Sequence, residues 1–380
     1  MDFELSEDQQ LMRDGAREFA QKRLAPVAEE LDEKGHIPDE IIKEAAELGF
    51  YGMTAPEEFG GLALDTLSYA LVIEELSKAC AAFAIMISVH NSLVIEALKK
   101  YGTDAQKEKY LPALASGEII GAYSLSEPGS GTDAGSLVCR AERKADHYLL
   151  NGTKTWVTSA AFAGIILTFV KTDPEKGSKG ISCLVIEKGT AGMNFGAPEK
   201  KMGLKASDTR EVSFMDAKVP LESLLGEENS GFKIALSLLD NGRIGVASQS
   251  LGIAQAAFDE ALKYAHEREQ FGQALVKFQA IQFKLAEMAT RIDAARLMTY
   301  RAAVLKDLEG RYSKEISMAK LFSSQTANYV ANEAVQIHGG YGYVKEYPVE
   351  RYFRDARVTE IYEGTTEAQK MVISRWLMKD

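Results

Sequence analysis

Cysteine is scarce in this sequence: only Cys80, Cys139 and Cys183 occur among 380 residues. An odd, widely spaced set without a Cys-x-x-Cys pair offers neither a disulfide framework nor a metal site, and it fits a reducing compartment. The five histidines are also scattered, and His266-Glu267 is not followed by the second histidine of a zinc-protease helix. The sequence therefore predicts no bound metal.

Basic residues are in the minority, with 44 lysines and arginines against 55 acidic residues and a formal net charge of −11. Because nucleic-acid binding requires clustered basic side chains, we expect no nucleic-acid partner. No stretch approaches the roughly 18 uninterrupted apolar residues of a membrane span, so we expect no membrane partner. The acidic start, Met1-Asp2-Phe3-Glu4-Leu5, lacks the features of a signal or transit peptide. The natural interpretation is a bacterial-type cytoplasmic protein, or an already processed organelle protein.

Hydrophobic spacing divides the chain into three parts. In residues 1–120 apolar side chains recur at helical intervals, and Ser6 with Gln9 forms a capping-box pattern before the first helix. Residues 121–230 change to short β-branched runs between turn residues, which indicates a β-domain. Helical patterns return in residues 231–380. The order helix–β–helix predicts an α+β protein.

Individual elements follow from the same patterns. In the first part we expect helices at 41–48, 65–80 and 82–100, and in the last part at about 231–266, 275–307, 314–338 and after Thr365. Buried strands are expected at 164–170, 181–186 and 211–214. Asn151-Gly152, between two strand-like runs, predicts a β-hairpin.

Two glycine-rich segments resemble nucleotide motifs only superficially. Gly129-Ser130-Gly131-Thr132-Asp133-Ala134 matches a variant of the dinucleotide fingerprint, but it precedes a β pattern rather than a helix. It fits a tight turn, or a loop whose backbone N–H groups approach a ligand. His338-Gly339-Gly340-Tyr341 follows a helix and lacks the Gly-Lys pair of a P-loop, so alone it indicates a glycine cap and turn. No Gly-x-Ser-x-Gly occurs, so a hydrolase nucleophile is unsupported.

Several segments are far more specific when they are taken together and in order. They are Tyr123-Ser124-Leu125-Ser126-Glu127-Pro128-Gly129-Ser130-Gly131-Thr132-Asp133, Trp156-Val157-Thr158-Ser159, Arg268-Glu269-Gln270-Phe271-Gly272 with Phe278-Gln279, Gln336-Ile337-His338-Gly339-Gly340, and Ile361-Tyr362-Glu363-Gly364-Thr365. Over the whole chain they closely resemble acyl-CoA dehydrogenases. Within that family, this chain most resembles the short-chain (butyryl-CoA) branch, notably in residues 239–249.

This resemblance implies both the architecture and the chemistry. The implied fold has an N-terminal helical domain, a central β-barrel or sandwich domain and a C-terminal four-helix bundle, with boundaries at 1–120, 121–230 and 231–380. The implied assembly is a homotetramer, a dimer of dimers, with FAD between subunits. The implied reaction is α,β-dehydrogenation of an acyl-CoA, with electrons passed to electron-transferring flavoprotein.

By resemblance, Glu363 is the base that removes the α-proton. A carboxylate suits this role if a closed apolar pocket raises its pKa; without the resemblance, a glutamate beside a helix N-terminus would be the simpler explanation. Some relatives place the base one residue before the equivalent of Arg243, but that residue is Gly242 here. The Glu363 N–H, with a flavin ribityl hydroxyl, would bind the thioester oxygen.

The resemblance also assigns cofactor contacts. The Leu125 main chain, Ser126 and Thr158 would hydrogen-bond the flavin ring, and Tyr123 would contact the cofactor. Trp156 would flank the ring; a buried strand aromatic is the alternative for Trp156. The remaining residues would bind the rest of FAD: Arg268, Gln270 and Phe271 from a neighbouring subunit at the ADP half, Gln336, Gly339 and Gly340 at the pyrophosphate, and Gln279, Thr365 and Glu367 at further contacts.

Substrate contacts are implied for Thr132, Asp240, Arg243 and Gly364, although a helix-surface or interhelical ion pair is the alternative for Arg243. The helix near residues 83–95 would line the acyl pocket. Glutaryl-CoA dehydrogenases carry an arginine near the position of Ala84, so its absence argues against a dicarboxyl substrate. We expect butyryl-CoA first, with branched or cyclic short acyl groups as alternatives.

Three other functions remain open at this point. An oxidase-like enzyme would let oxygen reoxidise the flavin, but typical oxidases carry an extra C-terminal domain. A non-catalytic flavin- or CoA-binding protein would not need the intact Glu363-Gly364-Thr365 segment. A helical scaffold without a ligand would be colourless when purified.

Overall fold

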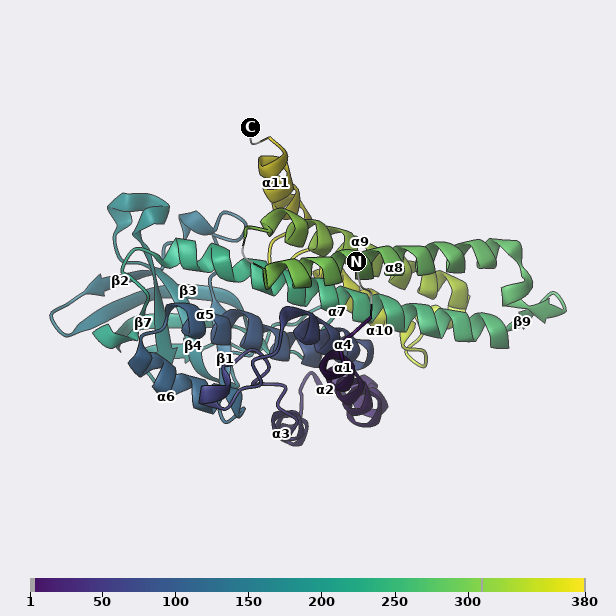
Figure 1. Ribbon diagram of the computed structural model, residues 1–380, viewed down its shortest axis with the longest axis horizontal. Helices are drawn as coiled ribbons and strands as arrows, with labels where there is room; N and C mark the ends of the chain where they lie inside the picture. Colours follow the sequence, from purple (N-terminus) through teal and green to yellow (C-terminus); the bar gives the residue numbers. More distant parts are fainter. Residues whose placement is uncertain (1–3, 309, 379–380) are drawn as a thin grey trace.

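Three groups of elements follow one another along the chain in the computed structural model, which describes residues 4–308 and 310–378 (Figure 1). Residues 1–3 of the N-terminal segment discussed above lie outside that range. A sheet occupies one end of the molecule, long helices extend away from it, and the N-terminal helices pack along one side (Figure 1). Over the described residues, no helix has both the length and the hydropathy needed to cross a membrane.

The N-terminal helices begin where the capping signal predicts. Helix α1 (Glu7–Phe19) starts after Ser6, whose hydroxyl accepts the Gln9 N–H at 3.2 Å while Gln9 bonds back to the Ser6 N–H. The further helices are α2 (Ala28–Lys34), α3 (Asp39–Glu47), α4 (Thr66–Val89), α5 (Glu96–Tyr101) and α6 (Asp104–Ala115). The expected break between two helices near residue 81 is confirmed as a non-helical Cys80 inside α4.

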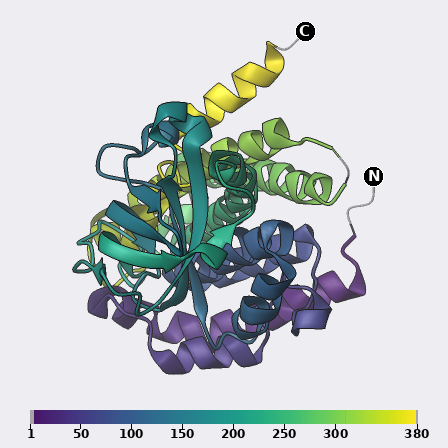
Figure 2. The same cartoon turned by 90° about the vertical axis from the view of Figure 1, so that its left-hand side faces the viewer.

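One eight-stranded sheet forms the central part (Figure 2). Its strands pair in the order β6-β7-β3-β2-β4-β5-β8, and β1 runs parallel to β4. The strands are β1 (Ile120–Ser124), β2 (Arg140–Arg143), β3 (His147–Thr158), β4 (Ala163–Lys171), β5 (Ile181–Glu187), β6 (Met193–Phe195), β7 (Thr209–Pro220) and β8 (Leu224–Leu225). The predicted strands at 164–170, 181–186 and 211–214 are thus confirmed.

The predicted hairpin at Asn151-Gly152 is wrong. Both residues lie inside the continuous strand β3, and the chain reverses earlier, between β2 and β3. Gly152 has a φ of 144° and marks a register irregularity between β3 and β7. A Cβ there would stand 2.7 Å from Cys139. The glycine is therefore required by a bulge and a close approach rather than by a turn.

The C-terminal part is a bundle of long helices. These are α7 (Gly231–Glu267), α8 (Gln279–Lys306), α9 (Ser313–His338), α10 (Val349–Val358) and α11 (Thr366–Leu377), with a small hairpin of β9 (Glu269–Gln270) and β10 (Gln273–Ala274) at the end of α7. The predicted helices are confirmed, except that α8 begins later than residue 275 because 275–277 form a short 3₁₀ turn. Helix α10 was not anticipated.

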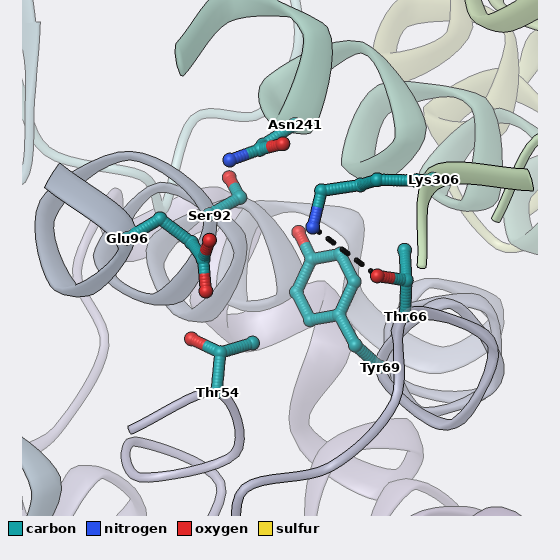
Figure 3. Close-up of a pocket in the computed structure, with 7 residues that line it drawn as sticks. All are labelled: Thr54, Thr66, Tyr69, Ser92, Glu96, Asn241 and Lys306. Carbon is teal, nitrogen blue, oxygen red and sulfur yellow. Dashed lines mark hydrogen bonds between the residues drawn. The ribbon is translucent and has the colours of Figure 1, made fainter. Parts of the chain in front are cut away.

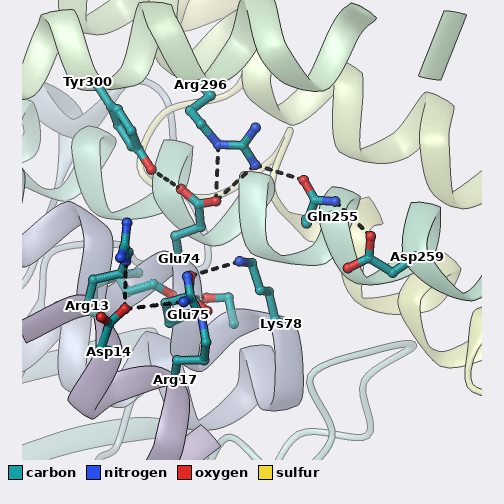
Figure 4. Close-up of polar contacts among 12 residues, drawn as sticks. Arg13, Asp14, Arg17, Glu74, Glu75, Lys78, Gln255, Asp259, Arg296 and Tyr300 are labelled. Atoms are coloured by element: carbon teal, nitrogen blue, oxygen red, sulfur yellow. Dashed lines mark hydrogen bonds and ion pairs between the residues drawn. The ribbon is translucent and has the colours of Figure 1, made fainter. Parts of the chain in front are cut away.

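Buried acidic residues of α4 bind this helix both to the C-terminal bundle, through Glu74, and to α1, through Glu75 (Figure 4). Glu74 accepts hydrogen bonds from Arg296 at 3.1 Å and from the Tyr300 hydroxyl at 2.8 Å, both on α8. The adjacent Glu75 pairs with Arg17 of α1 at 2.9 Å. Removing one partner of a buried ion pair is strongly destabilising. These contacts therefore hold α4 firmly against the bundle, next to the site described below.

Candidate active site

Glu363 occupies a left-handed turn between α10 and α11. Its φ is 52°, and that of Gly364 is 93°. This conformation costs a residue with a side chain roughly 1–2 kcal/mol, whereas glycine adopts it readily. Immediately afterwards Thr365 caps α11 by accepting the Ala368 N–H at 3.2 Å. The strained residue is therefore the predicted base, and backbone strain of this kind clusters at functional sites.

Two buried side chains hold this turn. Lys320 Nζ from α9 donates to the Gly364 carbonyl oxygen at 2.8 Å, and Gln369 Nε2 from α11 donates to the same oxygen at 2.9 Å. Gln369 Nε2 also lies 3.3 Å from the Glu363 carbonyl oxygen. Both side chains are fully buried. Three hydrogen bonds thus hold the carbonyl groups of the left-handed pair itself.

The Glu363 carboxylate has a perturbed protonation equilibrium. The residue as a whole is partly exposed, but its Oε2 atom is buried and has no hydrogen-bond partner among the described residues. Burial raises the pKa of Glu363 to about 7, and the positive charges of Arg243 and Lys320 oppose this rise. A carboxylate with such a pKa is suited to accept a proton at neutral pH.

Arg243 approaches this carboxylate from α7. Its Nη1 donates to Asp240 at 2.6 Å on the same helix, so the ion pair is intrahelical rather than interhelical, and Arg243 is buried rather than on the helix surface. Its Nε atom is buried and has no partner within the described parts of the chain. Arg243 therefore keeps one hydrogen-bond donor uncommitted beside Glu363.

Glycines of α7 bring that helix close to the base and to α4. A Cβ at Gly242 would lie 2.5 Å from Glu363 Oε2, and a Cβ at Gly245 would lie 2.2 Å from Ser88 Oγ and 2.5 Å from the Tyr69 hydroxyl. The two hydroxyl groups are themselves hydrogen-bonded at 2.8 Å. One helical turn beyond the base, the space between α4 and α7 is therefore filled.

A small polar cavity lies behind Tyr69 (Figure 3). Its volume is about 10 Å³, which is room for a single water molecule. Lys306 Nζ donates to Thr66 Oγ1 across it at 3.2 Å. The other lining residues are Thr54, Ser92, Glu96 and Asn241. This cavity cannot take an extended acyl chain.

The predicted flavin-ring contacts lie on β3 and on the segment after β1. The Thr155 N–H donates to the Ser126 carbonyl oxygen at 2.9 Å. Lys154 Nζ donates to the Leu125 carbonyl oxygen at 3.0 Å and pairs with Glu127 at 2.7 Å, and both charged side chains are buried. This network fixes the backbone of residues 125–127. The following glycine-rich segment begins as a tight turn, closed by reciprocal hydrogen bonds between Glu127 and Ser130.

Trp156 is not the buried strand aromatic that the sequence left as an alternative. Its φ is 61°, its pairing with β7 is irregular, and its side chain is 62% exposed. Bulges near active sites redirect side chains in this way. Thr158 follows on the same strand and is partly exposed. The indole ring thus offers an uncovered flat surface beside a hydroxyl group.

Strand β1 brings Tyr123 close to the Glu363 turn. The pKa of Tyr123 is raised well above its usual value, first by burial and second by the Glu363 negative charge. The Tyr123 hydroxyl has no partner among the residues described. The predicted base and the predicted ring-binding segment therefore border the same region.

A second group of predicted residues forms a separate pocket of about 660 Å³. Arg268, Gln270, Gly339 and Gly340 line it together, and the Arg268 guanidinium lies 5.5 Å from the Tyr341 ring centre. Both glycines leave the backbone open, because a Cβ on either would meet nothing within 4 Å. The pocket thus combines a cation, an aromatic ring and accessible backbone.

The two groups lie at opposite ends of the molecule. The β9–β10 hairpin carries Gln270, one of the residues that line this pocket. The hairpin lies at the end of the bundle that is farthest from the sheet (Figure 1). Phe271 in that hairpin is 95% exposed. Thr132, Gln279, Gln336 and Glu367 are also exposed. One chain therefore does not bring all the predicted cofactor residues together.

Each group suits a different part of FAD. The uncovered Trp156 ring and the unpartnered Tyr123 hydroxyl fit an aromatic ring system with polar edges. The pocket at Arg268 fits a phosphate-bearing, aromatic group, because guanidinium and open glycine backbone both suit phosphate. The residues present therefore fit a dinucleotide cofactor, but at two separate sites on each chain.

Comparison with known proteins agrees with this geometry. Models of the N-terminal, middle and C-terminal domains of acyl-CoA dehydrogenases match residues 6–118, 122–217 and 229–378. The chain therefore belongs to the acyl-CoA dehydrogenase family, whose members are FAD-dependent oxidoreductases.

Several of the similar proteins are of the short-chain type. The short-chain specific acyl-CoA dehydrogenase of Bos taurus is 47% identical over 376 residues, covering 99% of this chain and 91% of that protein. The butyryl-CoA dehydrogenase structure from Megasphaera elsdenii is 46% identical with a TM-score of 0.98, covering 100% of both chains. A chain in a structure described as the electron transferring flavoprotein of Acidaminococcus fermentans is 49% identical with a TM-score of 0.98, again covering 100% of both.

Sequence reasoning missed several residues that shape this site. Lys320 and Gln369 hold the turn, and Lys154 with Glu127 fixes the segment after β1. Apart from Lys154, each of these polar residues lies in a sequence pattern that gives no sign of burial. The residue becomes buried only through tertiary packing. For Lys154 a signal existed, since it falls on the same side of the alternating strand as buried residues.

Proposed function

We propose that this chain dehydrogenates a short-chain acyl-CoA to the trans-2-enoyl-CoA, with Glu363 as the base that removes the α-proton. The observation that carries the proposal is the buried, unpartnered Oε2 atom of Glu363, whose pKa is raised to about 7 by burial. A structural carboxylate would be paired. A catalytic base must keep a free oxygen for the incoming proton and a pKa near the working pH.

The thioester oxygen needs a hydrogen-bond donor as the α-proton leaves. The Glu363 backbone N–H makes no hydrogen bond to any described residue, and the left-handed turn fixes its direction. We therefore assign it to the thioester carbonyl, where it would stabilise developing negative charge. FAD, when bound, supplies the acceptor for the β-hydride.

A small acyl group is supported by the close approach of α4 and α7. Tyr69 and Ser88 fill the space one turn beyond Glu363, at Gly245. The rise of one helical turn is about 5.4 Å, enough for the few carbons that follow the α-carbon of a butyryl group. Branched or cyclic short acyl groups remain the alternative. Asp240, Arg243, Gly364 and Thr132 are the proposed contacts to the rest of the substrate.

The cofactor site is proposed to form between two copies of the chain. Tyr123, Leu125, Ser126, Trp156 and Thr158 would contact the flavin of their own subunit. The residues at the far end of the bundle, Arg268, Gln270, Phe271, Gln279, Gln336, Gly339 and Gly340, would bind the ADP half of the neighbour's FAD, and Thr365 and Glu367 would complete the site. The separation of the two groups on one chain supports this assignment (Figure 1).

The assembly proposed is a homotetramer built as a dimer of dimers. Helix α11 projects from the rest of the chain (Figures 1 and 2) and exposes Met371 and Leu377. Exposed apolar side chains on a projecting helix favour contact with another subunit. Electron-transferring flavoprotein is the proposed electron acceptor, supported by the likeness to the Acidaminococcus fermentans chain.

We also propose a cellular location and a set of domain boundaries. We propose a cytoplasmic protein, consistent with its buried free cysteines. We propose domain boundaries at 1–120, 121–230 and 231–380, supported by the start of β1 at Ile120 and of α7 at Gly231.

Anaerobic mixing with acyl-CoA substrates tests the proposal. Butyryl-CoA is expected to bleach the oxidised flavin band rapidly, and octanoyl-CoA far more slowly. A preference for isobutyryl-CoA would retain the chemistry and change the acyl group. A clear optimum with octanoyl-CoA would reject the short-chain assignment, and a flavoprotein that no acyl-CoA reduces would reject the reaction in favour of a non-catalytic binding protein. Peroxide release in air would favour an oxidase.

A further inference from the structure

A lysine ammonium group lies buried behind the turn that carries Glu363. Lys320, in the middle of α9, is fully buried. Lysines are almost never fully buried unless they are paired. Yet no described carboxylate lies within 4 Å of Lys320 Nζ, and its hydrogen bond goes to the Gly364 carbonyl oxygen at 2.8 Å. The position therefore carries a desolvation cost that local pairing does not offset.

The hydrogen bond alone does not explain why this residue is charged. Gln369 also donates to the Gly364 carbonyl oxygen at 2.9 Å, so that oxygen would keep one of its two hydrogen bonds without Lys320. An apolar side chain would fill the same space in α9 without the cost of burying a charge. The charge itself therefore needs a role, and Glu363, the residue next to Gly364, carries a carboxylate on which that charge acts.

The two groups affect each other's ionisation. Burial lowers the pKa of Lys320 to about 8, and the Glu363 charge opposes that shift. The Lys320 charge in turn opposes the rise in the pKa of Glu363. At neutral pH the lysine is still mostly protonated, so its field stabilises the ionised carboxylate.

Two cations act on Glu363, and among the described residues only one of them is paired with a carboxylate. Arg243 from α7 opposes the rise in the pKa of Glu363 more strongly than Lys320 does, but its charge is shared with Asp240 at 2.6 Å. The acidic Glu360, after α10, and Glu367, on α11, act on Lys320. The nearby tyrosines carry no charge at physiological pH, as is usual for tyrosine, and burial raises their pKa further: Tyr69 from α4, Tyr123 from β1, and Tyr362.

We propose that Lys320 is a positioning residue for the base: its ammonium group holds the Gly364 carbonyl, and with it the left-handed turn, and its charge keeps the Glu363 carboxylate ionised. The inference rests on the proposed function, in which Glu363 removes the α-proton. It assigns two separable tasks to Lys320, one of geometry and one of charge.

Two variants separate these tasks. Lys320→Met removes both the hydrogen bond and the charge, whereas Lys320→Gln keeps a donor and removes the charge. The pKa of Glu363 can be measured without turnover, from the infrared carboxyl band that disappears in Glu363→Gln. Both variants are expected to raise that pKa by about one unit or more. The pH dependence of anaerobic flavin reduction should move in the alkaline direction with it, and Lys320→Met should also lose rate at its plateau.

A matched control is Lys201→Met. Lys201 also donates to a backbone carbonyl oxygen, that of Ser207 at 2.7 Å, and burial also lowers its pKa. This variant should leave the Glu363 titration unchanged. FAD content and thermal unfolding show which variants are folded, and Lys320→Gln decides the question if Lys320→Met does not fold.

An unchanged Glu363 titration in a folded Lys320 variant would overturn the inference. Because the infrared titration needs no substrate, this outcome is distinct from failure of the proposed function. If butyryl-CoA did not reduce the flavin of the parent protein, the proposed reaction would fail, while the titration would still report on Lys320.

Discussion

The Oε2 atom of Glu363 lies against Gly242 of α7, so closely that a Cβ at position 242 would be 2.5 Å from it. Glycine at this position leaves the space that the carboxylate occupies. A side chain at residue 242 would need that same space. A base at position 242 is therefore incompatible with the present conformation of Glu363.

Gly242→Ala is therefore expected to displace the carboxylate. A misplacement of about 1 Å costs roughly 10²-fold in rate, so flavin reduction by butyryl-CoA should fall by about that factor. FAD content should be retained. The control is Gly15→Ala on α1, where a Cβ would meet nothing within 4 Å. Equal reduction rates in the Gly242→Ala variant and the parent would show that Glu363 does not act from this position.

The pH dependence of reduction follows from the raised pKa of Glu363. The base must be ionised to accept a proton, so the reduction rate should increase as pH rises through about 7. Stopped-flow measurement of flavin bleaching at saturating butyryl-CoA tests this. A rate that falls over the same interval would contradict it.

The same shift has a consequence for stability. A carboxyl group whose pKa is higher in the folded state than its ordinary 4.5 stabilises the fold at acid pH, and that contribution is lost as pH rises from about 4.5 to about 7. Glu363→Gln removes the charge, so it should raise the melting temperature at about pH 8 relative to the parent, with a smaller gain near pH 5.

Separation of the two cofactor groups predicts complementation between subunits. Arg268→Ala alone should weaken FAD binding, because hydrogen bonds from a charged group contribute about 1.5–3 kcal/mol, and Glu363→Gln alone should slow reduction by about 10²–10⁴-fold. In a mixed dimer, one site would carry both lesions and the other would carry neither. Only some of the co-expressed dimers are mixed, and each mixed dimer has one intact site. Co-expression should therefore restore up to about a quarter of the parental activity, averaged over all sites.

Tagging the two chains differently allows the mixed assembly to be purified. If one chain supplied both Glu363 and Arg268 to the same FAD, no mixed assembly would contain an intact site. Activity no greater than that of the separate variants would therefore contradict a cofactor site shared between subunits.

The buried Lys154–Glu127 pair predicts a strongly non-additive effect on stability. Glu127 also accepts the N–H groups of Val138 at 2.6 Å and Cys139 at 3.0 Å. Lys154→Met leaves that carboxylate buried without its cation, which costs about 3–5 kcal/mol. Adding Glu127→Gln should recover part of the loss. Denaturant unfolding measures both, and additive losses would argue against coupling between the two side chains.

The sequence patterns predicted most helices and strands because these depend on local spacing. Ser6 and Gln9 identified the start of α1, and the long apolar periodicity identified α7 and α9 to within a residue or two. Gly152 misled because a turn and a bulge require the same glycine, and only the approach of Cys139 distinguishes them.

The candidate site depended on the family resemblance rather than on spacing. Glu363 is one of many acidic residues, and its left-handed backbone and unpartnered oxygen arise from tertiary contacts. Lys320 has no sequence signal at all, since a lysine in a helix is ordinarily solvated. The proposal that Arg268 and Trp156 contact different FAD molecules also lies beyond local pattern, because it depends on the separation of these two residues in the folded chain.

The role of Glu363 is tested most directly by anaerobic mixing of the Glu363→Gln variant with butyryl-CoA. The variant should retain bound FAD, because its side chain differs little in size, while its reduction rate should fall by about 10²–10⁴-fold, the usual contribution of a general base. A yellow protein whose flavin stays oxidised would agree with Glu363 as the base. Bleaching as rapid as in the parent protein would contradict it.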